Sequence, residues 1–191
     1  MAGKQAKILS SDHIEDLLFF ADRSRYPSRN RLIILLSVRA GLRAAEIAKL
    51  TWEMVLEPDG GVGSVVELQD HIAKKRGGRS IPLHADVRAT LKAMARGCEC
   101  KGPIIRSERG GAMTPLSIVI WFSRAYEALG LTGCSSHSGR RTFITRAARL
   151  VHQAGGSLRD VQLLAGHRSI QTTQRYIDGD SDAQRKLVSL L

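Results

Sequence analysis

The chain has 191 residues, of which 29 are Lys or Arg and 18 are Asp or Glu, so its formal net charge at pH 7 is +11. A chain of this length can bury a core without disulfides or a metal, and its 43% hydrophobic and 25% charged residues exclude a wholly disordered protein. The positive excess favours a polyanionic partner, whereas only 5% aromatic residues disfavour a platform that stacks single-stranded bases.

The N-terminal segment is not a signal peptide, because acidic residues interrupt its apolar part. No apolar run approaches the roughly 18 residues that a membrane span needs. The cysteines are odd in number and lack the spacing of a disulfide framework or a zinc site: Cys98, Cys100 and Cys134. We therefore expect a cytoplasmic protein with free thiols, no metal, no cofactor and no membrane partner.

The first third of the chain is predicted to be helical. Residues 10–12 can cap an amphipathic stretch that continues to about residue 21, and an apolar run within 30–39 indicates a buried helix. Gly41 marks a turn, after which helical spacing resumes over 44–50.

The middle of the chain changes character. Glycines separate apolar stretches around 52–55 and 64–68, a pattern typical of short strands. Basic residues and glycines over 74–79 indicate a hairpin tip before a strand at 80–83. Helices are then expected over 85–96, 115–129, 138–153, 157–165 and 169–177. The predicted class is α+β, mostly helical with one small antiparallel sheet.

Arg43 lies at the start of a predicted helix, after the turn at Gly41 and among apolar residues. Its charge would be costly to bury without a partner, and Glu46 lies on the same helical face. The pair is either a guanidinium held in a site by its carboxylate or a plain ion pair at the surface.

His137 and Arg140 lie one turn apart where a helix is predicted to begin, since Ser135 or Ser136 can cap it. The N-terminus of a helix favours anions, and an imidazole beside a guanidinium there could bind a phosphate. The alternative is an ordinary cap with incidental basic residues.

His167 follows Gly166, which is expected to end one helix, and Ser169 can cap the next helix, which is expected to carry Tyr176 toward its end. Taken alone, Tyr176 would more often be a half-buried core phenol. His167 would more often be a loop histidine bound to backbone.

The order of these segments carries more information than any one of them. AGLRAAEI (40–47), a basic hairpin, HSGR (137–140) and LAGHRSIQTTQRY (164–176) follow one another along the chain. This arrangement resembles the tyrosine recombinase (phage integrase) family over roughly residues 8–178. The mostly helical catalytic domain of that family, with its small antiparallel sheet, matches the predicted fold.

The matching positions imply a catalytic set with one supporting acid: Arg43, His137, Arg140, His167, Tyr176 and Glu46. The family's hairpin lysine corresponds best to Lys74, eight residues before Pro82, with Lys75 in reserve because sequence does not fix a hairpin register. Further basic side chains are expected to contact DNA phosphates or to lie near them: Lys75, Arg76, Arg79, Arg141 and Arg146.

The resemblance implies that Tyr176 attacks a DNA phosphate, forms a 3′-phosphotyrosyl link and expels a 5′-hydroxyl. The arginines would neutralise the transition state, and His137 would act as general base. Lys74 would protonate the leaving oxygen and His167 would bind the phosphate. No metal or other cofactor is implied.

Two features depart from the family pattern. Gly139 stands where the family often has Leu between its His and Arg. Most members also carry an N-terminal core-binding domain of about a hundred residues, and the chain is similar to short members that lack it. We expect a catalytic domain over 1–180 and a tail over 181–191 that packs on a neighbouring protomer or folds back on its own core.

The expected partner is double-stranded DNA, bound by a homotetramer or by an assembly with related recombinases. The nearest rival is a type IB topoisomerase-like enzyme, which uses a similar residue set to relax supercoils. A non-catalytic DNA-binding regulator with this fold is the other alternative. A basic membrane-surface protein is set aside, because the sequence lacks a cationic amphipathic helix with aromatic anchors.

Overall fold

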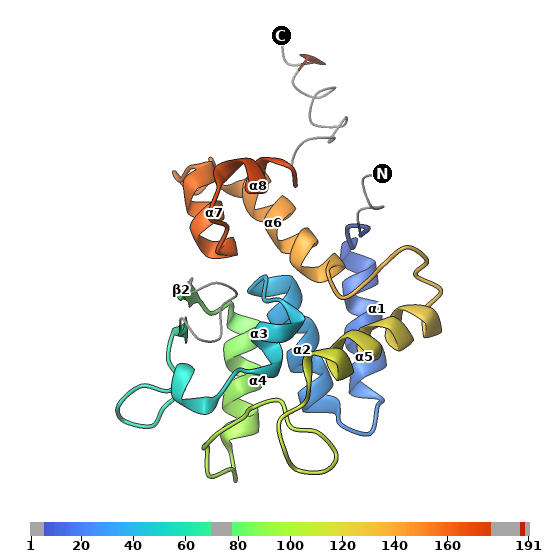
Figure 1. The fold of residues 1–191 in the computed structure, drawn as a ribbon, viewed down its shortest axis with the longest axis vertical. Helices are drawn as coiled ribbons and strands as arrows, with labels where there is room; N and C mark the ends of the chain where they lie inside the picture. Colours follow the sequence, from blue (N-terminus) through green and yellow to red (C-terminus); the bar gives the residue numbers. More distant parts are fainter. Residues whose placement is uncertain (1–5, 70–77, 177–187, 190–191) are drawn as a thin grey trace.

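The computed structural model describes residues 6–69, 78–176 and 188–189. In chain order its elements are α1 (Ser11–Asp22), α2 (Pro27–Arg39), α3 (Ala44–Ala48), the 3₁₀ turn η1 (Trp52–Met54), β1 (Val65–Leu68), β2 (Arg79–Pro82), α4 (Ala85–Ala95), α5 (Pro115–Ala128), α6 (Ser138–Leu150), α7 (Leu158–Ala165) and α8 (Ile170–Gln174) (Figure 1). The two strands form a small antiparallel sheet, and the predicted α+β class is confirmed. No helix in the described ranges is long and apolar enough to cross a membrane.

The helix ends follow from local chemistry. Ser10 caps α1, because its Oγ accepts a hydrogen bond from the backbone N–H of His13 at 3.1 Å. α2 begins at Pro27, earlier than predicted, since a proline in the first turn has no N–H to satisfy. Gly166 ends α7 in the left-handed conformation (φ 61°), as the sequence predicts. α6 ends at Leu150 rather than near residue 153.

The sheet differs in two places from the prediction. β2 begins at Arg79 rather than at residue 80, and Arg79 lies opposite Leu68 of β1. The segment around Trp52, predicted as strand, forms η1 because the N–H of Val55 bonds back to the carbonyl of Trp52. Residues 74–77 of the hairpin tip predicted over 74–79 lie outside the described residues.

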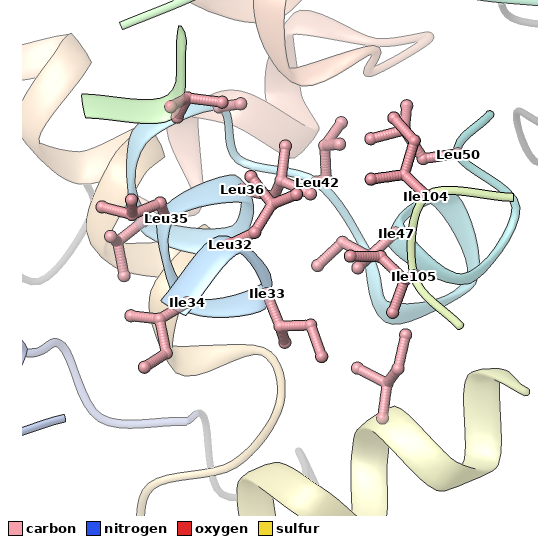
Figure 2. Packing of buried hydrophobic residues seen from close by; sticks show 14 of the residues in the cluster. Leu32, Ile33, Ile34, Leu35, Leu36, Leu42, Ile47, Leu50, Ile104 and Ile105 are labelled. Atoms are coloured by element: carbon pink, nitrogen blue, oxygen red, sulfur yellow. The ribbon is translucent and has the colours of Figure 1, made fainter. Parts of the chain in front are cut away.

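α2 lies at the centre of the main core, which explains its continuous apolar run. Residues 32–36 are at most 1% exposed, because α2 contacts helices on several sides, α1, α3, α4 and α6. Figure 2 shows this helix beside the apolar side chains that follow it in the core: Leu42, Ile47, Leu50, Ile104 and Ile105. Each such side chain, fully buried, contributes about 1.5–3 kcal/mol.

α6, α7 and α8 lie together at one end of the molecule (Figure 1) and enclose a second, smaller apolar cluster. Its buried members are Ile144, Val151, Val161 and Ala165, and Tyr176 packs against them. We call this group of helices the C-terminal lobe. The first turn of α6 is packed on α2, so the candidate site residues gather where the lobe meets the main core.

Candidate active site

Arg43 is placed by the turn at Gly41 and by α3. Gly41 has φ 65°, and a Cβ there would lie 2.4 Å from the ring of Phe143. Arg43 is the N-cap of α3: its backbone N–H donates to Oε2 of Glu46 at 2.8 Å and its Nη1 to Oε1 at 2.9 Å. The Glu46 side chain is 1% exposed and that of Arg43 is 28% exposed. The carboxylate is therefore inside the fold, and the Arg43 guanidinium extends from it toward solvent.

Arg79 binds the same carboxylate and does not lie on the open surface. Its side chain is 8% exposed, and Nη1 and Nη2 donate to the two oxygens of Glu46 at 3.0 and 3.2 Å. Its Nε donates to the carbonyl of Leu164 at 2.9 Å. A phosphate contact at Arg79 stays a prediction, which the pairing of its guanidinium with Glu46 does not favour.

Arg140 joins the main core to the C-terminal lobe from the first turn of α6. It is 3% exposed, Nη1 donates to the carbonyl of Gly41, and Nη2 donates to the carbonyl of Ala165 at 2.6 Å. Burial, followed by the charge of Arg43, lowers the pKa of Arg140 to about 10. The guanidinium still carries its positive charge at neutral pH.

The packing of α6 on α2 explains why residue 139 is a glycine. A Cβ there would lie 2.3 Å from Oγ and 2.9 Å from Cβ of Ser37, and 3.0 Å from Val38. The missing side chain therefore lets the first turn of α6 approach α2 closely. The helix itself begins at Ser138, with His137 rather than Ser135 or Ser136 as the N-cap.

Both ring nitrogens of His167 form hydrogen bonds. Its Nε2 lies 3.0 Å from Nη2 of Arg140, and its Nδ1 lies 3.0 Å from the hydroxyl of Thr173. Since a guanidinium only donates, Nε2 accepts and Nδ1 carries the proton that is donated to Thr173. Burial, then the charge of Arg140, lowers the pKa of His167 to about 4. The imidazole is therefore neutral at pH 7.

Tyr176 lies just past α8, which ends at Gln174 instead of continuing to residue 177. Its backbone carbonyl accepts a hydrogen bond from Thr145, and its ring stacks on that of His167 with centroids 5.3 Å apart. Tyr176 and the exposed His137 both line a pocket of about 420 Å³. The other lining residues are Ala6, Ser135, Arg141, Thr172 and Arg175.

Two of the expected phosphate contacts bind the N-terminal segment. Arg141 donates to the carbonyl of Ala6 at 2.9 Å, and Arg146 donates to the carbonyl of Leu9 at 3.4 Å. Arg141 lines the pocket, and Arg146 lies further along α6; a DNA contact at either residue stays a prediction. The remaining candidates on the hairpin, Lys74, Lys75 and Arg76, lie outside the described residues.

The structure thus places two hydrogen-bonded pairs close together, Arg43 with Glu46 and Arg140 with His167, and Tyr176 stacks on His167. The pairs are joined through α7, because Arg79 binds Glu46 and the carbonyl of Leu164 while Arg140 binds the next carbonyl, that of Ala165. We call this set of contacts the network. Sequence reasoning missed that Arg79 belongs to this network. The signal was available: side chains alternate along a strand, so Arg79 shares a face with the buried Ile81. No group of three or more potential metal ligands occurs among the described side chains.

The sequence profile of the Phage integrase family matches residues 7–182, and the chain belongs to that family. Its curated relatives include the tyrosine recombinase XerC of Bradyrhizobium diazoefficiens, 31% identical over 160 residues that cover 81% of this chain and 47% of the relative. XerC of Myxococcus xanthus is 32% identical over 78% of this chain and 49% of the relative. The chain thus spans about half the length of these relatives.

Solved structures share the fold. XerA recombinase matches 100% of this chain and 65% of its own with a TM-score of 0.75 and 20% identity. A lambda integrase dimer bound to a COC' core site matches 92% of this chain and 49% of its own, with a TM-score of 0.70 and 22% identity. XerH recombinase bound to difH in a pre-cleavage complex matches 99% of this chain and 55% of its own, with a TM-score of 0.71 and 22% identity. At these identities the likeness shows the shared fold.

Proposed function

We propose that this chain is the catalytic part of a site-specific DNA recombinase that cuts and rejoins strands through a 3′-phosphotyrosyl intermediate. The observation that carries the proposal is that Arg140 and His167 are hydrogen-bonded to each other beside Tyr176, with Arg43 close enough for its charge to act on both. The XerC relatives are recombinases, and the XerH and lambda integrase structures hold DNA. These facts support double-stranded DNA as the partner.

The geometry supports separate chemical roles for the site residues in the attack on a phosphodiester. Arg140 is buried and charged, and Arg43 extends from its buried carboxylate, so both offer preorganised donors to the oxygens of the transition state. A phenol with a pKa near 10 needs a base to become a nucleophile. His137 lines the same pocket as Tyr176 and is the general base in this proposal.

Neutral His167 acts differently from the base. With its Nε2 bound to Arg140, it orients that guanidinium and presents a ring face to Tyr176. When a phosphate enters, Nε2 can donate to one of its oxygens only after the ring changes tautomer, so that Nε2 carries the proton and Nδ1 accepts from the hydroxyl of Thr173. The leaving 5′-oxygen takes its proton from Lys74, with Lys75 as the alternative.

Tyr176→Phe tests the proposal. On a nicked DNA duplex, where cleavage traps the covalent complex, the wild-type chain is expected to form an adduct that resists denaturation. Tyr176→Phe is expected to form none and to bind the same duplex as before. The control is Tyr26→Phe, since Tyr26 precedes α2 and stacks with Arg25 and Arg29, outside the network. Adducts that persist in Tyr176→Phe would refute Tyr176 as nucleophile.

The assembly and the tail remain part of the same proposal. A cytoplasmic homotetramer on DNA, or an assembly with related recombinases, would exchange strands between two sites. In the proposal the catalytic domain covers 1–180, and the tail over 181–191, whose boundary lies outside the described residues, packs on a neighbouring protomer. Deletion of 181–191 should then abolish synapsis in a gel-shift assay and spare binding to one site. Unchanged synapsis would exclude the tail as the link.

A further inference from the structure

We propose that Arg79 is a positioning residue of the active site, which fixes Arg43 through Glu46 and at the same time fixes the end of α7 that leads to His167. The inference rests on the proposed function for its kinetic test alone. Arg79 is in β2, far in sequence from both groups that it joins, so its contacts tie three separate segments together.

The contacts to Glu46 are those of a paired guanidinium and carboxylate. Nη1 to Oε1 is 3.0 Å and Nη2 to Oε2 is 3.2 Å, the parallel arrangement that fixes both groups in orientation. The same carboxylate accepts the backbone N–H and the Nη1 of Arg43. With four donors on two oxygens, Glu46 has one available orientation, and Arg43 is held by it.

Charge gives the second reason. Glu46 is 1% exposed, and the charged groups that face it are Arg43 at the start of α3, Arg79 of β2 and Arg140 of α6. Burial acts to raise the pKa of Glu46, but the hydrogen bond and charge of Arg79, and then the contacts of Arg43, lower it below its ordinary value. Without Arg79 the buried carboxylate would keep only the partly exposed Arg43 and the more distant Arg140, so its ionised form would lose stability.

The contact to α7 gives the third reason. Two consecutive carbonyls at the negative end of that helix each bind one arginine: Leu164 binds Arg79, and Ala165 binds Arg140. The next residue, Gly166, leaves room for this arrangement, because a Cβ there would lie 2.7 Å from Nη1 of Arg79. His167 follows directly, so a displaced Arg79 would disturb both the Arg43 side and the His167 side of the site.

A direct phosphate contact is the competing role. Burial alone does not separate the two roles, because Arg140 is 3% exposed. What distinguishes Arg79 is that its Nη1 and Nη2 are both bound to the carboxylate of Glu46, so its charge is already paired. The two roles predict different behaviour in solution. A phosphate contact contributes to DNA affinity and to its salt dependence, whereas a positioning residue contributes to the rate of cleavage.

The kinetic test uses Arg79→Gln and Arg79→Lys on the nicked duplex. Arg79→Gln should form the Tyr176 adduct on the order of 100-fold more slowly, as expected for a small misplacement of reacting groups, with DNA affinity retained. Arg79→Lys should recover only part of the rate, because lysine cannot make the parallel bonds. The matched control is Arg88→Gln: Arg88 of α4 also donates to a backbone carbonyl, that of Val62, and does not contact the network.

A double-mutant cycle of Arg79 and Glu46 distinguishes a positioning role of Arg79 from a mere loss of protein stability. The double variant Arg79→Gln/Glu46→Gln removes both members of the buried pair and should fold better than Arg79→Gln alone. If Arg79 acts through Glu46, adding Arg79→Gln to Glu46→Gln should slow cleavage by less than about threefold, the sign of strongly coupled sites. If the cleavage rate of the double variant falls by the product of the two single-variant losses, the proposal is wrong.

A readout independent of activity uses ¹³C-labelled glutamate, with Glu46 assigned from the resonance missing in Glu46→Gln. In the free protein, Arg79→Gln should raise the titration midpoint of Glu46 by about one pH unit or more. An unchanged midpoint, a wild-type cleavage rate, or a loss confined to DNA affinity with a smaller salt slope would each overturn the inference. If the wild-type chain forms no adduct but the midpoint shifts, the proposed function fails and the link between Arg79 and Glu46 stands.

Discussion

His167 illustrates how the site sets the state of a single residue. It lies between the charged Arg140 and the hydroxyl of Thr173, and its pKa falls to about 4. An imidazole that stays neutral can accept a hydrogen bond from a guanidinium and does not add a second charge beside it. The expected role in phosphate binding then needs a change of tautomer that puts the proton on Nε2, and no second proton.

A stability prediction follows for the same residue. The pKa of His167 is about 6.5 when unfolded and about 4 when folded, so between these values the unfolded state binds more protons. The contribution of His167 to the free energy of unfolding is therefore fully present above about pH 6.5 and is lost as the pH falls toward 4. By pH 5 this residue should remove about 2 kcal/mol of unfolding free energy. Urea unfolding at pH 7 and pH 5 measures it, and His167→Gln should show a loss smaller by that amount.

A pH dependence identical in wild type and His167→Gln would mean that the folded pKa of His167 is not lowered. Thr173→Val provides a second measurement, because it removes the hydroxyl that holds Nδ1 and leaves Arg140 in place. It should weaken cleavage more than DNA binding, since the ring would lose its fixed orientation.

At the scale of elements, Gly139 sets how closely α6 approaches α2. Gly139→Ala should destabilise the fold by about 1–3 kcal/mol, as overpacking does, because the new methyl group would meet Ser37. Thermal or urea unfolding measures the change. Gly111→Ala is the matched control, since no atom lies within 4 Å of a Cβ placed there, and it should change stability by less than about 0.5 kcal/mol.

Ser37→Gly supplies the complementary variant. It removes both atoms that a methyl group at residue 139 would contact most closely, so Gly139→Ala should cost less in the Ser37→Gly background than in the wild type. Equal costs in the two backgrounds would show that the close contact between α2 and α6 does not determine the need for glycine.

The helices were largely predictable from sequence, because apolar periodicity and capping residues are local signals. Ser10 before α1 and Gly166 after α7 are such cases. The environment of Arg79 was not predicted, because its partners Glu46 and Leu164 are 33 and 85 residues away in the chain. The early end of α8 before Tyr176 was also missed, since the sequence there continues with helix-compatible residues.

At the scale of the whole molecule, the net charge of +11 divides into two parts. Arg79 and Arg140 are buried and serve the network, so they add little to the field at the surface. The remaining excess is available for phosphates of a duplex. We therefore expect the buried arginines to act at the site and the other basic residues to attract DNA.

DNA affinity should therefore fall steeply with salt. Using Tyr176→Phe to prevent cleavage, the logarithm of the binding constant should decrease linearly with the logarithm of salt concentration, with a slope of about −0.9 for each phosphate neutralised. Fluorescence anisotropy with a labelled duplex measures the slope. A slope near zero would contradict DNA binding that is mainly electrostatic.

The N-terminal segment bears on how the protein should be handled. Ala6 is part of the wall of the pocket that holds Tyr176, and Arg141 binds its carbonyl. Five residues of extended chain reach no further than about 18 Å, so a purification tag fused before residue 1 would be tethered within that distance of the pocket wall. Cleavage rates measured with such a tag would report on crowding at the pocket as well as on chemistry, and a removable or C-terminal tag keeps the two apart.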